Sequence, residues 1–341
     1  MSDITTIIGS AEWLAHRYDP TGDTIHFRHV PRDVHARATF ITEEYLPKDA
    51  QTVVLRRQDC LEALAAGPGP APVQFVFHSA YCCSTLVARA FDAAGMAMGL
   101  KEPVILNDIV GWRRRGGQPD RVAGVLDSAL TLLARPFGPG ESVIVKPSNV
   151  FNGFAAATLG LRPTASALML YAPLTSFLRS IAKKGMWGRL WVRELFAGQL
   201  ADGIVDLGFA PADYIKLTDL QIAAVGWLAQ HAMFNKLSQR FGARVATLDS
   251  ETLLAHPEAA IAALASLYAI PMDARTIAAI ASGPAFSSHS KSGEAFSAKE
   301  RDLEQAEAAA THAEEIDKVA IWAEAVAGNA GVPMKLPNAL C

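Results

Sequence analysis

Small and polar residues near position 80 join a short apolar run to an arginine-bearing helical pattern. This loop, called the 79–85 loop, consists of Ser79, Ala80, Tyr81, Cys82, Cys83, Ser84 and Thr85. Where a strand turns directly into a helix, unpaired backbone N–H groups and the positive end of the helix dipole bind oxyanions. The pattern therefore predicts a main-chain site for phosphate or sulfate, to which the hydroxyls of Ser84 and Thr85 contribute. A plain helix N-cap in an α/β protein is the alternative interpretation.

The 79–85 loop lacks the residues that nucleotide hydrolases place in G-x-x-x-x-G-K-S/T. His78 and Cys83 stand in the glycine positions, Ser84 stands in the lysine position, and only Thr85 fits. A kinase without that lysine, and without an evident magnesium-binding aspartate, is short of charge at the transferring phosphoryl group. A nucleotide-dependent phosphotransferase is therefore the disfavoured alternative. We expect His78 mainly to orient the loop, and we keep it as a candidate catalytic residue.

A second candidate is the basic segment over residues 174–193, which follows an apolar run ending at Tyr171. It contains five cations and no acidic residue: Arg179, Lys183, Lys184, Arg189 and Arg193. Arg179 and Lys183 are four residues apart and therefore share a helix face. In a chain with 31 basic and 34 acidic residues, this local excess predicts an anion site. A solvated basic helix face is the alternative.

Two further lysines are candidate anion ligands. Lys146 ends the apolar run at residues 142–145, where a lysine is unusual unless its ammonium group has an anionic partner. Lys291 lies in the Ser/Gly-rich segment SSHSKSGEAF, for which an ordinary surface loop is the alternative. We expect both lysines to reach an oxyanion between the 79–85 loop and the basic segment.

The elements that must position these residues alternate between strands and helices. Strand patterns lie at residues 74–77, 98–101, 142–145, 165–171 and 244–248, and the main helical patterns between them lie at 121–134, 175–198 and 219–241. This alternation predicts a three-layer α/β/α fold with a mostly parallel sheet, in which ligands collect at the carboxyl ends of the strands.

A small N-terminal appendage is expected over residues 1–72, before the main domain at 73–341. Its predicted elements are a helix at 11–17, strands at 24–29 and 52–55, and a helix at 59–66, and the run GPGPAP closes it. Near the other end, residues 298–327 are predicted to form an amphipathic helix.

Composition excludes several classes of protein. The 341 residues, 50% of them hydrophobic, suit one large α/β domain with an appendage, and the net charge of −3 argues against nucleic-acid binding. Four cysteines without a C-x-x-C pair or a His-Cys spacing predict a reduced, cytoplasmic protein without a metal site. The acidic N-terminus carries no apolar signal core, and no uncharged run is long enough to span a membrane.

Two segments resemble the sulfotransferases. Residues 80–85 are similar to the P-(K/R)-S-G-T-T-like segment of their 5′-phosphosulfate loop. Residues 245–273 are similar to a late element of these enzymes, in which a strand is followed by an acidic turn, an "xDP" segment, a helix and a final "GLP". The two matches occur in the family's order, and the resemblance covers residues 74–291. It implies a P-loop-containing nucleotide hydrolase-like (sulfotransferase) fold.

The resemblance also implies an activity, the transfer of a sulfuryl group from 3′-phosphoadenosine 5′-phosphosulfate to a hydroxyl or amine, with no metal. The 79–85 loop would hold the 5′ end of this donor. For the 3′-phosphate the family uses "R-x-P-x-x-x-x-x-S", where this chain has Tyr171, Pro173 and Arg179. Lys183 and Lys291 complete the implied donor site, because the family closes over its donor with a late basic loop. The acceptor would be a small molecule, a carbohydrate or a peptide, and the sequence gives no oligomeric state.

A general base is also implied by the resemblance. Glu102 matches by position the acidic residue of the "G-E-E" segment that tyrosylprotein sulfotransferases use as base, whereas Ser148 replaces the histidine that cytosolic sulfotransferases use. Glu102 is therefore the predicted base and Lys146 a catalytic cation, with His78 or His289 next in line. A surface carboxylate is the alternative for Glu102. A binding protein that kept the fold without catalysis is a third possibility, given Tyr81, Cys83 and Tyr171 in the motif positions.

Overall fold

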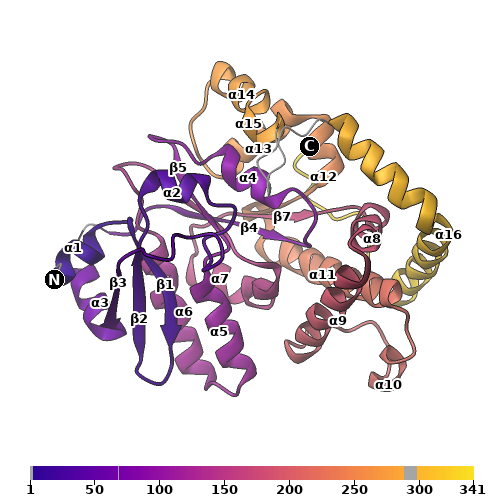
Figure 1. Ribbon diagram of the computed structural model, residues 1–341, viewed down its shortest axis with the longest axis horizontal. Helices are drawn as coiled ribbons and strands as arrows, with labels where there is room; N and C mark the ends of the chain where they lie inside the picture. The colour runs from indigo at the N-terminus through magenta and orange to yellow at the C-terminus, as the bar shows by residue number, and fades with distance from the viewer. Residues whose placement is uncertain (1–2, 68, 288–297) are drawn as a thin grey trace. The chain divides into compact units, whose positions relative to one another are not determined.

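A five-stranded sheet organises the main part of the chain. The computed structural model describes residues 3–67, 69–287 and 298–341. The sheet has the order β5-β6-β4-β7-β8, and helices form layers on its two faces (Figure 1). Strand β6 pairs in parallel with β4 and with β5. The N–H of Phe75 donates to Ser166 O, directly before β7, and the N–H of Ser79 donates to Leu170 O within β7. The predicted three-layer α/β/α fold with a mostly parallel sheet is confirmed.

The helices and strands follow one another closely along the chain. From the N-terminus they are α1 (Ile4–Gly9), β1 (Trp13–Asp19), β2 (Thr24–His29), α2 (Arg32–Arg37), β3 (Thr52–Arg56), α3 (Arg57–Ala65), β4 (Val73–His78), α4 (Ser84–Ala90), β5 (Ala97–Lys101), α5 (Val104–Arg114), α6 (Pro119–Leu133), β6 (Ser142–Lys146), η1 (Asn149–Phe154) and α7 (Ala155–Leu161). From β7 onward they are β7 (Ala167–Tyr171), α8 (Leu174–Lys183), α9 (Gly185–Ala201), α10 (Pro211–Tyr214), α11 (Asp219–Phe241), η2 (Gly242–Arg244), β8 (Val245–Asp249), α12 (Ser250–Ala255), α13 (Pro257–Leu267), α14 (Ala274–Ala281), α15 (Pro284–Ser287) and α16 (Ala298–Ala330).

By their internal contacts, the residues form two units. Unit 1 comprises Met1–Phe77, Thr85–Ala167 and Tyr268–Ile270, and unit 2 comprises His78–Ser84, Leu168–Leu267 and Pro271–Cys341. Each unit is described by itself below. The boundary predicted after residue 72 stays a prediction.

In unit 1, strands β1, β2 and β3 form a separate antiparallel sheet, and β1 packs against α5 and α6 (Figure 1). The expected helix at residues 11–17 is wrong, because these residues lead into and form β1. Trp13 pairs with His29 and Tyr18 with Ile25 across the ladder. Backbone bonds and buried side chains contributed by β2 outweigh the helical preference of the isolated segment.

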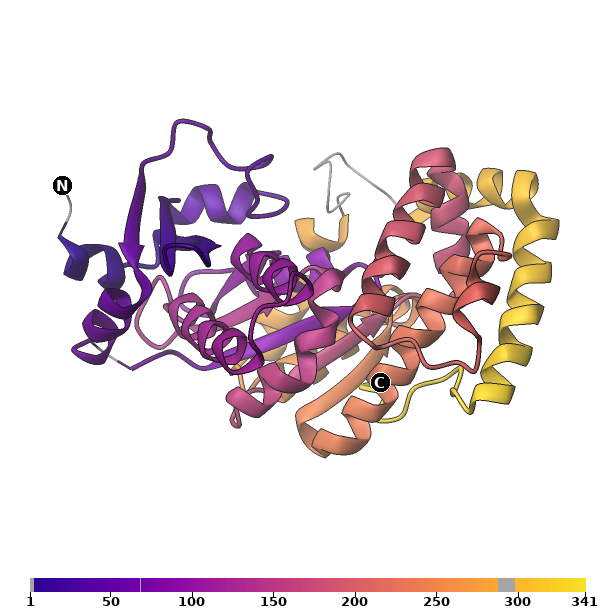
Figure 2. The ribbon, with the colours of Figure 1, turned by 90° about the horizontal axis from the view of Figure 1, so that it is seen from below.

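In unit 2, helices α8, α9, α11 and α16 pack against one another, and Figure 2 shows α16 beside this group. The expected single helix at residues 175–198 is wrong, because the helix is interrupted before Gly185 and continues as a separate helix, α9. Gly185 has φ +58°, a conformation that glycine adopts without steric cost. Helix α11 starts with a capping box between Thr218 and Gln221, which fixes its N-terminus.

Candidate functional site

The 79–85 loop joins β4 to α4, as the sequence predicts, and it is bonded to the end of β7. The N–H of Ser79 donates to Leu170 O at 3.0 Å, and the Ser79 hydroxyl accepts from the N–H of Ala172 at 3.2 Å. The Cys82 thiol lies 3.4 Å from the same Leu170 oxygen, to which it donates. Two side chains and one amide therefore hold the loop on the last residues of a buried strand.

The backbone of this loop has an unusual conformation. Ala80, Tyr81 and Cys83 have φ values of +73°, +51° and +64°, although none of them is glycine. Such a conformation costs about 1–2 kcal/mol for each residue with a Cβ atom, and it persists where the surroundings enforce it. Successive N–H groups in alternating right- and left-handed backbone form concave anion-binding nests. The loop thus contains three non-glycine residues with left-handed φ values within four positions.

His78 lies at the start of the loop and is 4% exposed. Its Nδ1 atom accepts a hydrogen bond from the N–H of Ala80 at 3.1 Å. This contact fixes the first left-handed residue of the loop, which is what an orienting residue would do. Ser84 and Thr85 begin α4 and are also buried.

Tyr81 occupies the loop position at which the sulfotransferase motif has lysine or arginine. Its ring contacts Phe177 of α8, with centroids 6.2 Å apart, and the edge of Trp191 of α9 at 5.5 Å. Burial raises the pKa of Tyr81 to about 12, so its hydroxyl is neutral at physiological pH. The side chain thus anchors the loop to α8 and α9 and supplies no charge.

Arg179 and Lys183 lie on the solvent side of α8, four residues apart as predicted. Arg179 is half-buried, and among the residues that the structure describes no carboxylate or other hydrogen-bonding group contacts its guanidinium. Lys183 is exposed. A half-buried arginine without a partner is uncommon, because burial of a charge is costly unless it is paired. Arg179 is therefore the cation of this segment best suited to an external anion.

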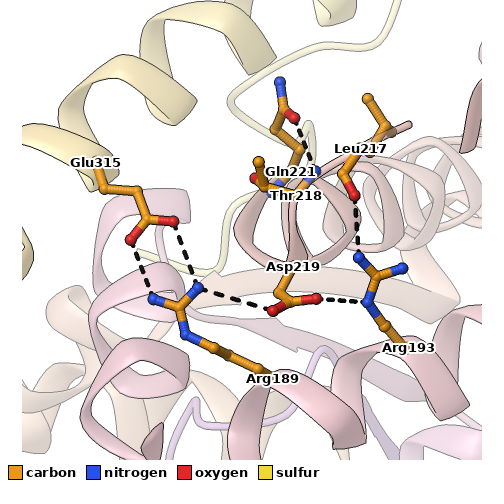
Figure 3. Close-up of polar contacts among 7 residues, drawn as sticks. All are labelled: Arg189, Arg193, Leu217, Thr218, Asp219, Gln221 and Glu315. Atoms are coloured by element: carbon orange, nitrogen blue, oxygen red, sulfur yellow. Dashed lines mark hydrogen bonds and ion pairs between the residues drawn. The ribbon is translucent and has the colours of Figure 1, made fainter. Parts of the chain in front are cut away.

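The other two arginines of the basic segment are compensated within the chain, which corrects the expectation of an uncompensated cluster. Arg189 pairs with Glu315 of α16 at 3.0 Å and lies 3.9 Å from Asp219 of α11 (Figure 3). Arg193 pairs with Asp219 at 2.5 Å and donates to Leu217 O. The acids come from helices far along the sequence, so inspection of residues 174–193 alone could not identify them.

Tyr171 stands where the family motif has the arginine for the 3′-phosphate. Its ring meets the edge of His231 at 4.6 Å, and the backbone of Leu336 hydrogen-bonds its hydroxyl. Burial and the nearby Asp249 carboxylate raise the pKa of Tyr171, so this position is neutral. The residues present thus fit the two ends of the donor differently. The 79–85 loop would offer backbone N–H groups to one anionic group. For a second phosphate, α8 offers the guanidinium of Arg179, which has no partner among the described residues.

Glu102 and Lys146 form an ion pair in unit 1. Lys146 ends β6 and is 1% exposed, while Glu102 follows β5, and its side chain is 21% exposed. The N–H of Glu102 donates to Lys146 O at 2.7 Å, and Glu102 has φ +59°. The anionic partner that a lysine at a strand end requires is therefore Glu102 itself, the residue predicted as base.

Two aromatic residues that the sequence analysis missed, Phe40 and Tyr45, lie beside this pair. The Lys146 ammonium lies 5.1 Å from the Phe40 ring centroid, and the Tyr45 ring contacts the Phe40 ring. Burial and nearby carboxylates, Glu102 among them, raise the pKa of Tyr45. The N–H of Ile41 donates to Lys101 O, which fastens the 40–45 segment to the end of β5. This segment has no strand or helix pattern, so no signal in the sequence places it here.

Lys101 is a second buried lysine, next to Lys146 in the register of β5 and β6. Its ammonium donates to His35 O at 2.7 Å and Ala36 O at 3.1 Å and lies 3.5 Å from Asp92. Burial lowers the pKa of Lys101 to about 8. A lysine within an apolar strand was the signal available for it. Its partners are all internal, so its role is structural.

Two of the predicted residues cannot be placed, and some kinds of site are absent from the described residues. Lys291 and His289 lie outside them. Within residues 3–67, 69–287 and 298–341, no group of three or more His, Cys, Asp or Glu side chains could hold a metal ion. Over the same residues, the helices are too short or too polar to cross a membrane. None of the four cysteines, all of which are described, forms a disulfide bond.

Comparisons with known proteins give a limited result. No protein-family model matches the sequence, and no curated protein matches it. Among solved structures, the sulfotransferase domain from the curacin biosynthetic pathway matches with 11% identity and a TM-score of 0.41, over 67% of this chain and 84% of that domain. A likeness at this level establishes neither a family nor an activity, so the functional argument depends on the chain's own residues.

Proposed function

We propose that this protein is a sulfotransferase-like enzyme that transfers a sulfuryl group from 3′-phosphoadenosine 5′-phosphosulfate to a hydroxyl or amine. The observation that carries the proposal is the 79–85 loop, in which Ala80, Tyr81 and Cys83 adopt left-handed backbone directly before a helix. Strained non-glycine residues of this kind concentrate at ligand sites. The motif resemblance of residues 80–85 and 245–273 supplies the identity of the donor.

In this proposal the two ends of the donor are held by groups of different kinds. Backbone N–H groups of the loop and of the first turn of α4 surround the phosphosulfate, and His78 keeps the loop in shape. Arg179 contributes charge for the 3′-phosphate, in place of the arginine that Tyr171 replaces. Lys183 adds to the positive potential around the donor, and Lys291, outside the described residues, stays a candidate from the sequence.

Sulfuryl transfer requires in-line placement of donor and acceptor and a base for the acceptor proton. Glu102 would accept the proton of the acceptor hydroxyl as its oxygen forms the new S–O bond and the bridging S–O bond of the donor breaks. Lys146 would act as a positioning residue, because its buried ammonium fixes one carboxylate oxygen of Glu102. The other oxygen then remains for the acceptor.

A binding protein without catalysis is the second candidate, and two observations favour it. Lys146 engages the Glu102 carboxylate, and Tyr81 replaces the cation of the loop. The chain could then bind a sulfated or phosphorylated ligand and leave it unchanged. Turnover and binding must therefore be measured separately.

A thermal-shift panel tests the proposal. Adenosine 3′,5′-bisphosphate should raise the melting temperature, and ATP with magnesium should raise it less, because a ligand that binds only the folded state stabilises it. Glu102→Gln should keep this shift while lowering turnover by a factor on the order of 100 to 10,000. A larger shift with ATP and magnesium would favour a phosphotransferase. Full turnover in Glu102→Gln would remove the proposed base.

A further inference from the structure

The junction of α8 and α9 exposes apolar and basic side chains together. Five consecutive residues are exposed there: Lys183, Lys184, Gly185, Met186 and Trp187. Met186 and Trp187 are 70% and 60% exposed, and Leu190, one helical turn after Met186, is 56% exposed. We call these residues, with Leu190, the α8–α9 corner. Single exposed apolar residues are common on proteins, but three large ones beside two lysines mark an interaction surface.

The corner is held rigidly from within unit 2. Trp187 stacks on Trp191 with ring centroids 6.4 Å apart and an interplanar angle of 13°, and Trp191 meets Tyr81 edge-on. Further along α9, ion pairs fasten Arg189 and Arg193 to Asp219 and Glu315 (Figure 3). The exposed apolar side chains of the corner thus lie at the start of a helix that ring contacts and ion pairs fasten to the rest of unit 2.

We propose that the α8–α9 corner docks on the surface of an anionic lipid bilayer. Tryptophan, methionine and leucine insert at the boundary between headgroups and acyl chains, and flanking lysines interact with anionic headgroups. None of the six residues of the corner is acidic, and the acids found against α9, Glu315 and Asp219, are paired with Arg189 and Arg193. Because the chain as a whole has a net charge of −3, attraction to an anionic membrane must come from a local cluster of this kind.

The charge of the corner disfavours self-association as its use. In a symmetric dimer the same patch faces itself, so Lys183 and Lys184 of the two copies would be brought together. A lipid surface instead supplies the opposite charge and an apolar layer at the same place. The corner shares Lys183 with the proposed donor site, but the variants that test the corner leave Lys183 unchanged, and neither conclusion requires the other.

Co-sedimentation with vesicles tests this inference on the full chain. The protein should bind vesicles of phosphatidylcholine and phosphatidylserine more strongly than vesicles of phosphatidylcholine alone, and added salt should weaken binding. Met186→Ser/Leu190→Ser should lower partitioning at least tenfold. Lys184→Gln should lower it about fivefold on anionic vesicles only, since one lysine near the surface contributes about that factor.

Matched controls change the same residue types elsewhere in unit 2. Ile215 and Ile321 are 82% and 69% exposed, and Lys236 is an exposed lysine of α11. Ile215→Ser/Ile321→Ser and Lys236→Gln should leave vesicle binding unchanged. No binding of the wild type, or equal losses in the corner and control variants, would overturn the inference. So would a change of oligomeric state in Met186→Ser/Leu190→Ser without vesicles, because the corner would then be a protein interface.

Discussion

Removing either charge of the Glu102–Lys146 pair should have unequal effects on stability. Glu102→Gln leaves the Lys146 ammonium, 1% exposed, with a neutral amide as its neighbour. Loss of one partner costs about 3–5 kcal/mol for a fully buried pair. The side chain of Glu102 is 21% exposed, and glutamine can still accept a hydrogen bond, so we expect a loss of about 2–3 kcal/mol in the free energy of unfolding.

The reverse change, Lys146→Met, leaves a carboxylate that water can reach. The methionine keeps most of the apolar stem in the buried position of Lys146, so the expected loss is about 1 kcal/mol. The double variant should lose less stability than Glu102→Gln alone, because no buried charge is then left unpaired. Urea unfolding with unchanged m-values measures all three. A Lys146→Met variant less stable than Glu102→Gln, or additive losses, would refute this reasoning.

Three further predictions concern strain and pH. Ala80→Gly should stabilise the protein by about 0.5–1 kcal/mol in urea unfolding, because glycine adopts a φ of +73° without strain. The control Ala325→Gly, at an exposed position of α16, should cost about 1 kcal/mol. A loss of stability in both variants would contradict strain at Ala80. Burial lowers the pKa of Lys101 to about 8 from 10.5, so between these pH values the unfolded chain binds more protons than the folded chain. The free energy of unfolding should therefore rise with pH by up to about 1.4 kcal/mol per pH unit over this range. Lys101→Met should lack this rise, and equal pH slopes in the variant and the wild type would contradict the prediction. Burial lowers the pKa of His231 to about 3 from 6.5, so the free energy of unfolding should fall as pH decreases from 6.5 toward 3. His231→Gln should reduce this fall. The same fall in the variant and the wild type would show that the folded protein already protonates the imidazole.

The sequence predicts the parts of this fold that follow local rules. Strand β2 and helix α11 have the predicted bounds, since alternation of apolar residues and a capping box are local signals. The parallel sheet follows from alternating strands and helices. The requirement of Lys146 for an anion also follows from its place in an apolar strand.

The remaining features depend on partners that are distant along the chain. The identity of the Lys146 partner follows from the parallel register of β5 and β6, which brings the ends of the two strands together. Pairing with β2 makes β1 a strand despite its helical pattern. Acids from α11 and α16 neutralise Arg189 and Arg193, whereas the half-buried Arg179 has no partner among the described residues. Composition alone contains none of these pairings.

Calorimetric titration of adenosine 3′,5′-bisphosphate at two salt concentrations tests the central claim most directly. The account predicts binding to the wild type that weakens with salt, and weaker and less salt-dependent binding to Arg179→Ala, since a charge-assisted contact is lost. Arg193→Ala is the matched control, because Arg193 is already paired with Asp219, and it should bind as the wild type does. Absence of binding to the wild type, or identical affinity and salt dependence in Arg179→Ala, would contradict the proposed donor site.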